Sequence, residues 1–159
     1  MRRAFADELY KWMKKDPLIW VISVDLGYKL WDQIRDEFPD RFINTGAAEQ
    51  AAMGIAVGLA LEGKKPFIYS ITPFLLYRAF ETIRNYVSHE KIPVRLVGGG
   101  RGRDYAHEGW SHDASDDRKI IEASFPYVGR MWPMNVDQVA ECVAHMVNNN
   151  EPQYVNLKR

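Results

Sequence analysis

The sequence predicts an α/β fold, with a doubly wound, mainly parallel sheet of about six strands and helices on both faces. Short β-type runs alternate with helical segments along the whole chain, and this alternation is typical of parallel β-α units. The 159 residues contain no repeat, linker or low-complexity tract, so residues 1–159 are expected to form one domain. A hydrophobic content of 47% is sufficient for a sizeable core.

Hydrophobic spacing and the positions of Pro and Gly predict the helices. They are expected at residues 4–15, 30–37, 47–62, 73–89, 116–123 and 136–148. The β-rich runs between them predict strands at residues 18–24, 41–44, 66–70, 93–97, 126–131 and 153–157. Gly63 is the expected C-terminal cap of the third helix.

Ligands of doubly wound sheets bind beyond the C-terminal ends of the strands. Four segments of this chain are expected to reach that edge and to converge on one crevice. They are residues 25–27, 45–49, 70–74 and the polar, Gly-rich loop 98–115. A binding function is therefore expected there.

Composition excludes several classes of protein. Lys and Arg total 21 and Asp and Glu total 21, which argues against a nucleic-acid binder that neutralises phosphates. The longest apolar run, residues 66–77, is too short to span a membrane, and the N-terminus lacks a signal-peptide core. The single Cys142 excludes an intrachain disulfide and is typical of a reducing compartment, so a cytoplasmic location is expected.

The third helix combines an apolar body with one ionisable residue in its first turn. Residues 51–61 carry no charge, which predicts a helix that is covered on all sides. Glu49 must then be stabilised by the helix dipole, be partnered, or take part in proton chemistry. Gly54 and Gly58 give the helix a face of small residues that a second helix could approach closely.

The segment Arg41-Phe-Ile-Asn-x-Gly-x-x-Glu-Gln50, followed by Gly54-Ile-Ala-x-Gly-Leu-Ala-Leu-Glu-Gly63, resembles the pyrimidine-binding domain of transketolase-like thiamine diphosphate enzymes. That group includes 1-deoxy-xylulose-5-phosphate synthase and the split transketolases. The resemblance keeps motif order over essentially the whole chain. It continues through Pro66-Phe-Ile-Tyr-Ser70, Phe74–Arg78, Ala79-Phe-Glu-x-Ile-Arg84, Gly109-x-Ser-His112 and Pro152-x-Tyr-Val-x-Leu157.

The resemblance implies that Glu49 is catalytic and contacts N1′ of the cofactor's aminopyrimidine, where a shared proton activates the thiazolium carbon. Burial favours the protonated carboxyl that this role needs, whereas the helix N-terminus favours the anion. The sequence leaves that balance open. Phe74, with Ile71 and Tyr77, corresponds to the apolar wall on which the family stacks the pyrimidine ring, and Asp25 corresponds to a residue near the thiazolium.

The resemblance also assigns substrate contacts. His112 corresponds to a catalytic histidine that touches substrate oxygens, and a solvated loop histidine is the alternative. Lys29 stands where many relatives have a phosphate-binding Ser, and Arg159 stands where they have a phosphate-binding Arg. Two departures concern the loop: Trp110 and Ser111 replace the family's Pro and Thr, and a second histidine expected about twelve residues before His112 is missing.

The chain contains no Gly-Asp-Gly motif, with which the family holds Mg²⁺ and the cofactor diphosphate. The resemblance therefore implies that a diphosphate-binding partner chain holds both, and that the diphosphate-binding and C-terminal domains are absent from residues 1–159. We expect a homodimer alone and a heterotetramer with the partner. The expected reaction is transfer of a two-carbon ketol unit from a phosphorylated sugar or related ketose.

Three alternatives remain open at the level of sequence. One is a non-catalytic binding or regulatory domain, which the altered loop favours. Another is a subunit of a decarboxylating synthase similar to 1-deoxy-xylulose-5-phosphate synthase. The third is an unrelated nucleotide-binding domain. It is disfavoured because residues 98–102, Gly-Gly-Gly-Arg-Gly, are followed by Arg103 rather than the third glycine of a dinucleotide fingerprint.

Overall fold

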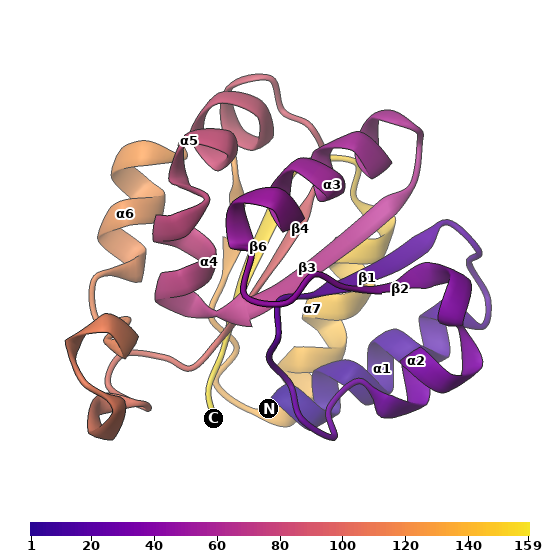
Figure 1. Cartoon of the computed structure of the whole chain (residues 1–159), viewed down its shortest axis with the longest axis horizontal. Helices are drawn as coiled ribbons and strands as arrows, with labels where there is room; N and C mark the ends of the chain where they lie inside the picture. Colours follow the sequence, from indigo (N-terminus) through magenta and orange to yellow (C-terminus); the bar gives the residue numbers. More distant parts are fainter.

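A six-stranded, fully parallel sheet forms the centre of the structure, a computed structural model that describes residues 1–159 (Figure 1). The strand order is β2-β1-β3-β4-β6-β5. The strands are β1 (Ile19–Ser23), β2 (Phe42–Asn44), β3 (Lys65–Ile71), β4 (Arg95–Gly99), β5 (Gly129–Met131) and β6 (Gln153–Leu157). The predicted doubly wound α/β fold is confirmed.

Helices cover both faces of this sheet. The α-helices are α1 (Arg2–Met13), α2 (Asp32–Glu37), α3 (Glu49–Leu61), α4 (Thr72–Arg78), α5 (Phe80–Thr82), α6 (Asp117–Ser124) and α7 (Val136–Asn148). Short 3₁₀ turns are η1 (Pro39–Arg41), η3 (Ala106–Glu108) and η4 (Trp110–His112), and η2 (Ile83–His89) is π-helical. No helix has the length and apolar character needed to cross a bilayer.

The sheet separates two cores. One holds 20 buried residues beneath α3, α4, η2 and α6, and the other holds 19 beneath α1, α2 and α7, so both faces are closed to a similar extent. Strands that are buried on both faces read as continuous apolar runs, as in Ile19–Ser23. This packing fixes the C-terminal ends of the strands, where the candidate site lies.

The prediction of one continuous helix at residues 73–89 is wrong. The chain leaves α-geometry at Ala79, where φ is −108° and ψ is 20°, so α4 ends at Arg78 and α5 and η2 follow. The strand expected from Pro93 begins two residues later, at Arg95. The break after Arg78 leaves that residue at the end of a short helix beside the site.

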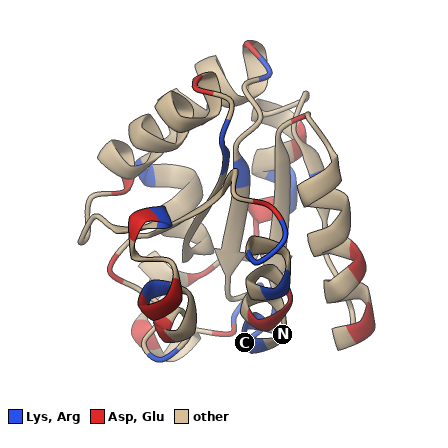
Figure 2. Ribbon diagram, turned by 90° about the vertical axis from the view of Figure 1, so that its right-hand side faces the viewer, with Lys and Arg blue, Asp and Glu red and all other residues tan.

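Helix α3 is buried on one side only in this single chain. Its inward face, Ala52, Met53, Ala56, Val57 and Ala60, belongs to the core. Its outward face is apolar and exposed, with Leu61 69% and Ile55 39% accessible. Figure 2 shows the helix without a charged residue between its ends. The expected cover on all sides is not supplied by this chain.

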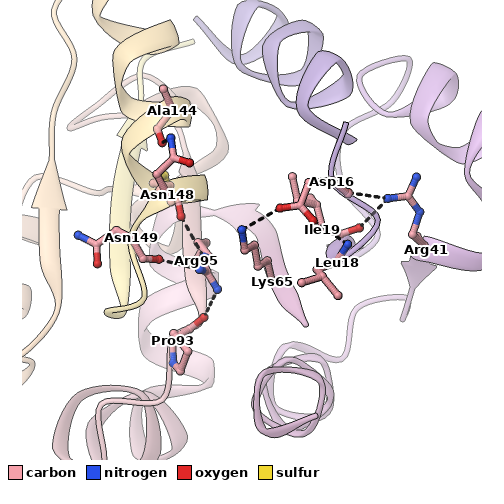
Figure 3. A network of polar contacts seen from close by, with 11 residues as sticks. Asp16, Leu18, Ile19, Arg41, Lys65, Pro93, Arg95, Ala144, Asn148 and Asn149 are labelled. Carbon is pink, nitrogen blue, oxygen red and sulfur yellow. Dashed lines mark hydrogen bonds and ion pairs between the residues drawn. The ribbon is translucent and has the colours of Figure 1, made fainter. Parts of the chain in front are cut away.

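A polar network closes the opposite edge of the sheet, at the N-terminal ends of the strands (Figure 3). Arg95 is buried and donates to the carbonyls of Met146 and Asn149 at 3.1 and 2.8 Å, which ties the end of α7 to β4. Burial lowers the pKa of Arg95 to about 10. Lys65 Nζ bonds Asp16 Oδ2 at 2.7 Å. These charged side chains already have partners within the chain, so the network stabilises the fold.

Candidate active site

The candidate site lies where three strands end. Glu49 follows β2, Phe74 follows β3, and the loop of residues 100–116 follows β4. Parallel strands bring these ends to one edge, as the sequence predicts. The structure joins Glu49, Phe74 and His112 there, and it adds Arg78 to them.

Glu49 is the first residue of α3 and is only 4% exposed. Its Oε1 accepts a hydrogen bond from Arg78 NH1 at 2.7 Å, and no other side chain bonds its carboxylate. The neighbouring Gln50 points to a different partner, with Nε2 donating to Thr82 Oγ1 at 2.7 Å. Glu49 is thus a buried carboxylate at this edge of the sheet, and Arg78 is its one side-chain partner.

Phe74 carries the aromatic surface of the site. The guanidinium carbon of Arg78 lies 3.7 Å from the centroid of its ring, which is stacking distance. The ring of His112 lies 4.8 Å away at an interplanar angle of 64°. Phe74 and Arg78 are four residues apart on α4 and therefore share one helix face.

His112 sits in the turn η4, which is held against α4. Its Nδ1 lies 3.0 Å from Ser111 Oγ, and its ring makes the contact with Phe74. Trp110 two residues earlier is 87% exposed. The structure therefore places His112 beside the predicted aromatic wall, while Trp110 projects into solvent.

Ile71 and Tyr77 flank the aromatic wall differently. Ile71 ends β3 and is buried. Tyr77 is partly exposed and its hydroxyl donates to the Asp116 carboxylate. Burial and that carboxylate raise the pKa of Tyr77. The hydrogen bond from Tyr77 to Asp116 thus links α4 to the start of α6. It involves neither Glu49 nor Arg78.

Asp25 and Lys29 lie in the loop after β1 and are exposed. Both adopt left-handed backbone geometry, with φ of 51° and 56°, and no hydrogen bond or ion pair joins either side chain to Glu49 or His112. Asn44 Oδ1 accepts from the Asp25 N–H at 3.3 Å, so the loop is tied to the end of β2. Their predicted roles remain predictions.

A second feature of this edge is not predicted by the sequence. A cavity of about 450 Å³ is lined by three arginines and no acidic residue; we call it the arginine cavity. Its lining consists of Met1, Arg2, Arg3, Gly27, Tyr28, Leu30 and Arg159. The resemblance assigns a phosphate contact to Arg159 but not to Arg2 or Arg3, and 156 positions of sequence separate Arg3 from Arg159 (159 − 3).

The arginines of this cavity have no salt-bridge partner. Arg2 NH1 donates to Tyr105 Oη at 2.8 Å, and the Arg159 guanidinium lies 5.2 Å from the same ring. Arg3 donates to the carbonyls of Leu30 and Lys29. Unpaired guanidinium groups around one hollow suit an anion.

A buried polar network supports the site from below. Asp117 Oδ2 accepts from Trp132 Nε1, Tyr154 Oη and Asn156 Nδ2 at 2.8, 3.0 and 2.8 Å. Thr72, at the start of α4, donates to the Gly100 carbonyl at 2.8 Å and accepts from Asn156. Burial, followed by Asp117, raises the pKa of Tyr154. The network links the base of Phe74's helix to the loop that carries His112.

Another cavity, of about 530 Å³, lies at the C-terminal ends of η2 and α6. Its lining includes Arg84, His89 and Tyr127 and none of the residues above. No cluster of His, Cys, Asp and Glu side chains in the chain could hold a metal ion. The residues proposed for catalysis and binding are therefore those around Glu49 and those of the arginine cavity.

Together the fold and the site define an α/β domain that presents a buried carboxylate beside an aromatic face at the end of a parallel sheet. The family described as the transketolase pyrimidine-binding domain matches residues 1–159, and the chain belongs to that family.

Several known proteins are similar to this chain. An apulose-4-phosphate transketolase subunit of Phocaeicola vulgatus is 29% identical over 99% of the chain and 51% of its own length. The 1-deoxy-D-xylulose-5-phosphate synthase of Clostridium perfringens strain 13 is 31% identical over 98% of the chain and 25% of its own. A solved split-gene transketolase, described as an inactive beta4 tetramer, has a TM-score of 0.86 at 31% identity, covering 99% of this chain and 51% of that one. The chain thus spans about half or less of the length of these relatives.

Proposed function

We propose that the chain is the pyrimidine-binding part of a two-chain, transketolase-like enzyme that transfers a two-carbon ketol unit with thiamine diphosphate. The observation that carries the proposal is the pairing of a buried carboxylate, Glu49, with an aromatic face, Phe74. An aminopyrimidine ring needs both a proton partner for N1′ and a flat surface for stacking. Membership of the family supports the same cofactor.

The residues present fit that group. A flat guanidinium already lies at 3.7 Å over Phe74 while it donates to Glu49, so the space accepts a planar hydrogen-bonding group in this position. When bound, thiamine diphosphate supplies the nucleophilic carbon that carries the two-carbon unit. Phe74 and Ile71 would hold the ring, and Glu49 would hold the proton shared with N1′.

The substrate contacts are proposed from the charges at this edge. The arginine cavity, with Arg2, Arg3 and Arg159, would bind the phosphate of a ketose or aldose, and Lys29 lies in the neighbouring loop. His112, beside Phe74, would orient a substrate oxygen. The names of two relatives contain a sugar phosphate, which supports a phosphorylated substrate.

A partner chain is proposed to hold Mg²⁺ and the diphosphate, since these 159 residues contain no Gly-Asp-Gly motif. The uncovered apolar face of α3 would pair with a second copy, giving a homodimer alone and a heterotetramer with the partner. The single buried Cys142, which forms no disulfide, favours a cytoplasmic location.

Two other functions each have an observation in their favour. The match to a 1-deoxy-D-xylulose-5-phosphate synthase favours a decarboxylating synthase, which uses the same Glu49 site with pyruvate as donor. The solvent-exposed Trp110, in place of the family's proline, favours a non-catalytic binding domain. Product analysis with pyruvate and with a phosphorylated ketose as donors separates the three.

The test is to combine the chain with a diphosphate-binding subunit, thiamine diphosphate and Mg²⁺, and to measure ketol transfer. Glu49→Gln should lower kcat by about 100-fold or more, because the proton partner of N1′ is lost. Glu62→Gln is the matched control, since Glu62 is an exposed carboxylate at the other end of α3. Full activity of the Glu49→Gln enzyme would refute the mechanism.

A further inference from the structure

Arg78 makes the two contacts that a flat cofactor ring would need in this site. Its guanidinium stacks on Phe74 at 3.7 Å, and its NH1 donates to Glu49 Oε1 at 2.7 Å. We propose that Arg78 occupies the aminopyrimidine position in the partner-free chain and is displaced when the ring enters. The inference rests on the function proposed above, and it makes Arg78 the residue that sets the affinity of this chain for the ring.

The local fold explains why Arg78 is in this position. Arg78 lies one helical turn after Phe74 on α4, and Glu49 is the first residue of α3. A carboxylate that is 4% exposed is strongly disfavoured without a partner, and Arg78 is the partner that the chain offers. A guanidinium is the side-chain cation that can stack on an aromatic ring and form a directed hydrogen bond at once.

Displacement is possible because Arg78 is only half buried. Its side chain is 47% exposed, so an outward rotation returns the guanidinium to water at little cost. Glu49, by contrast, has no comparable freedom at 4% exposure. The mobile member of the pair is therefore Arg78, and the carboxylate stays where the ring needs it.

Arg78 and the ring would also compete for the same carboxylate. Glu49 Oε1 accepts from Arg78 NH1, and no other side chain bonds this carboxylate. The proton shared with N1′ needs a Glu49 oxygen that is free of another donor. Entry of the ring is thus coupled to departure of the Arg78 side chain.

A different role for Arg78 leads to the opposite result. If Arg78 remained in place and gripped the bound ring, its removal would weaken binding. If Arg78 has to leave before the ring can enter, its removal should strengthen binding, because an occupied site lowers apparent affinity in proportion to the fraction that is open. The direction of the change therefore decides between the two roles.

The experiment titrates thiamine into the partner-free chain by calorimetry at neutral pH. Thiamine carries the aminopyrimidine and lacks the diphosphate that the partner would hold. Arg78→Met should bind thiamine about tenfold more tightly than the wild type, because no side chain has to leave. Arg78→Lys should fall between the two, since an ammonium can pair with Glu49 but cannot stack as a plane.

The matched control is Arg84→Met. Arg84 is exposed, and its guanidinium bonds only Asn85 Oδ1, at 3.4 Å. Its variant should bind thiamine as the wild type does. The inference is overturned if Arg78→Met binds thiamine no more tightly than the wild type, or if Arg84→Met gains as much.

Arg78→Met leaves Glu49 without its cation, so folding is checked by circular dichroism. The double variant Glu49→Gln/Arg78→Met removes both charges and should lose the gain in affinity, because a glutamine amide cannot share a proton with N1′. A gain that persists in the double variant overturns the inference. If Glu49→Gln inactivates the two-chain enzyme while Arg78→Met gains nothing, the proposed function stands and only this inference falls.

A spectroscopic readout follows the displacement directly. In the partner-free chain, the Arg78 side-chain protons lie over the Phe74 ring and should resonate upfield of their usual positions. Saturating thiamine should return them to ordinary shifts, as should Phe74→Leu without ligand. Shifts that stay upfield at saturation would overturn the inference.

Discussion

The side-chain amide of Asn156 donates to the carboxylate of Asp117 at 2.8 Å, across 39 positions of sequence. The same oxygen of Asp117 also accepts from Trp132 and Tyr154. Asp117 is 4% exposed and has no salt-bridge partner, so these three neutral donors satisfy its buried oxygen. Because Asn156 also bonds Thr72, the carboxylate supports the helix that carries Phe74.

Asp117→Ala should therefore destabilise the chain strongly. It removes the acceptor of Trp132 Nε1 and of the Tyr154 hydroxyl, and one of the acceptors of Asn156. Each donor left without an acceptor costs about 1–3 kcal/mol, so a loss of roughly 3 kcal/mol is expected. Asp117→Asn retains an oxygen in the same shape and should lose about 1 kcal/mol. Urea unfolding at neutral pH measures both, and equal losses in the two variants would contradict the role of the carboxylate as shared acceptor.

The elements could largely be predicted because each is encoded locally. The strand at residues 153–157 and the helix at residues 136–148 have the bounds that their hydrophobic patterns predicted. The break after Arg78 could not be predicted, since residues 74–80 read as a continuous helix and the departure at Ala79 is imposed by packing.

The site residues could be predicted from the sequence only where they belong to a short motif. Glu49, Phe74 and His112 lie in such motifs, and the structure brings them together. The arginine cavity joins residues from the two ends of the chain, and no local pattern reports such a meeting. The Arg78 contact depends on how α3 and α4 pack, which spacing alone does not define.

The exposed face of α3 predicts a surface that associates without being needed for the monomer fold. An added Cβ at Gly58 meets no atom within 4 Å, so the chain itself leaves room for a side chain there. Gly58→Ala should stabilise the monomer by up to about 1 kcal/mol through helix propensity. Gly58→Glu should keep the thermal midpoint near that of the wild type but place a charge on the apolar face.

Analytical ultracentrifugation should then show a monomer for Gly58→Glu under conditions where the wild type dimerises. The control is Glu62→Gln, at the exposed end of the helix. Gly63→Ala would not serve, because Gly63 has a φ of 74°, a left-handed geometry that is strained for alanine. A Gly58→Glu chain that still dimerises would show that α3 is not the contact surface.

Asp16 gives the chain an acid-sensitive contact on the edge opposite the site. Burial acts to raise the pKa of Asp16, but the hydrogen bonds from Lys65 and from the Leu18 N–H outweigh it, and the pKa is lowered. The folded state therefore binds this proton less readily than the unfolded state. The stabilisation is fully present above the unfolded pKa of about 3.9 and is lost as pH falls through the lower folded value.

Thermal unfolding between about pH 6 and pH 3 tests this contact. The midpoint of the wild type should fall more steeply below about pH 4 than that of Asp16→Asn, which has no proton to gain there. Asp40→Asn is the control, because Asp40 is exposed and forms no salt bridge. Parallel curves for the wild type and Asp16→Asn would show that the Lys65 pair does not respond to acid in this way.

The arginine cavity predicts that the substrate is selected by its charge. Arg2 and Arg159 line the cavity, and neither forms a salt bridge within the chain. A charge-assisted bond to a phosphate contributes about 1.5–3 kcal/mol, so Arg159→Met should raise KM for a phosphorylated ketose about tenfold or more. The effect on kcat should be small, since no hydrogen bond or ion pair joins these arginines to Glu49.

Steady-state kinetics of the proposed two-chain enzyme with a phosphorylated ketose and its unphosphorylated counterpart check this selection. The unphosphorylated substrate should be unaffected by Arg159→Met or Arg2→Met, because its end offers no charge for the arginines to bind. Arg130→Met is the control, since Arg130 is exposed on β5 outside the cavity. An equal rise in KM for both substrates would mean that the substitutions disturb the site as a whole, and the phosphate would have to bind elsewhere.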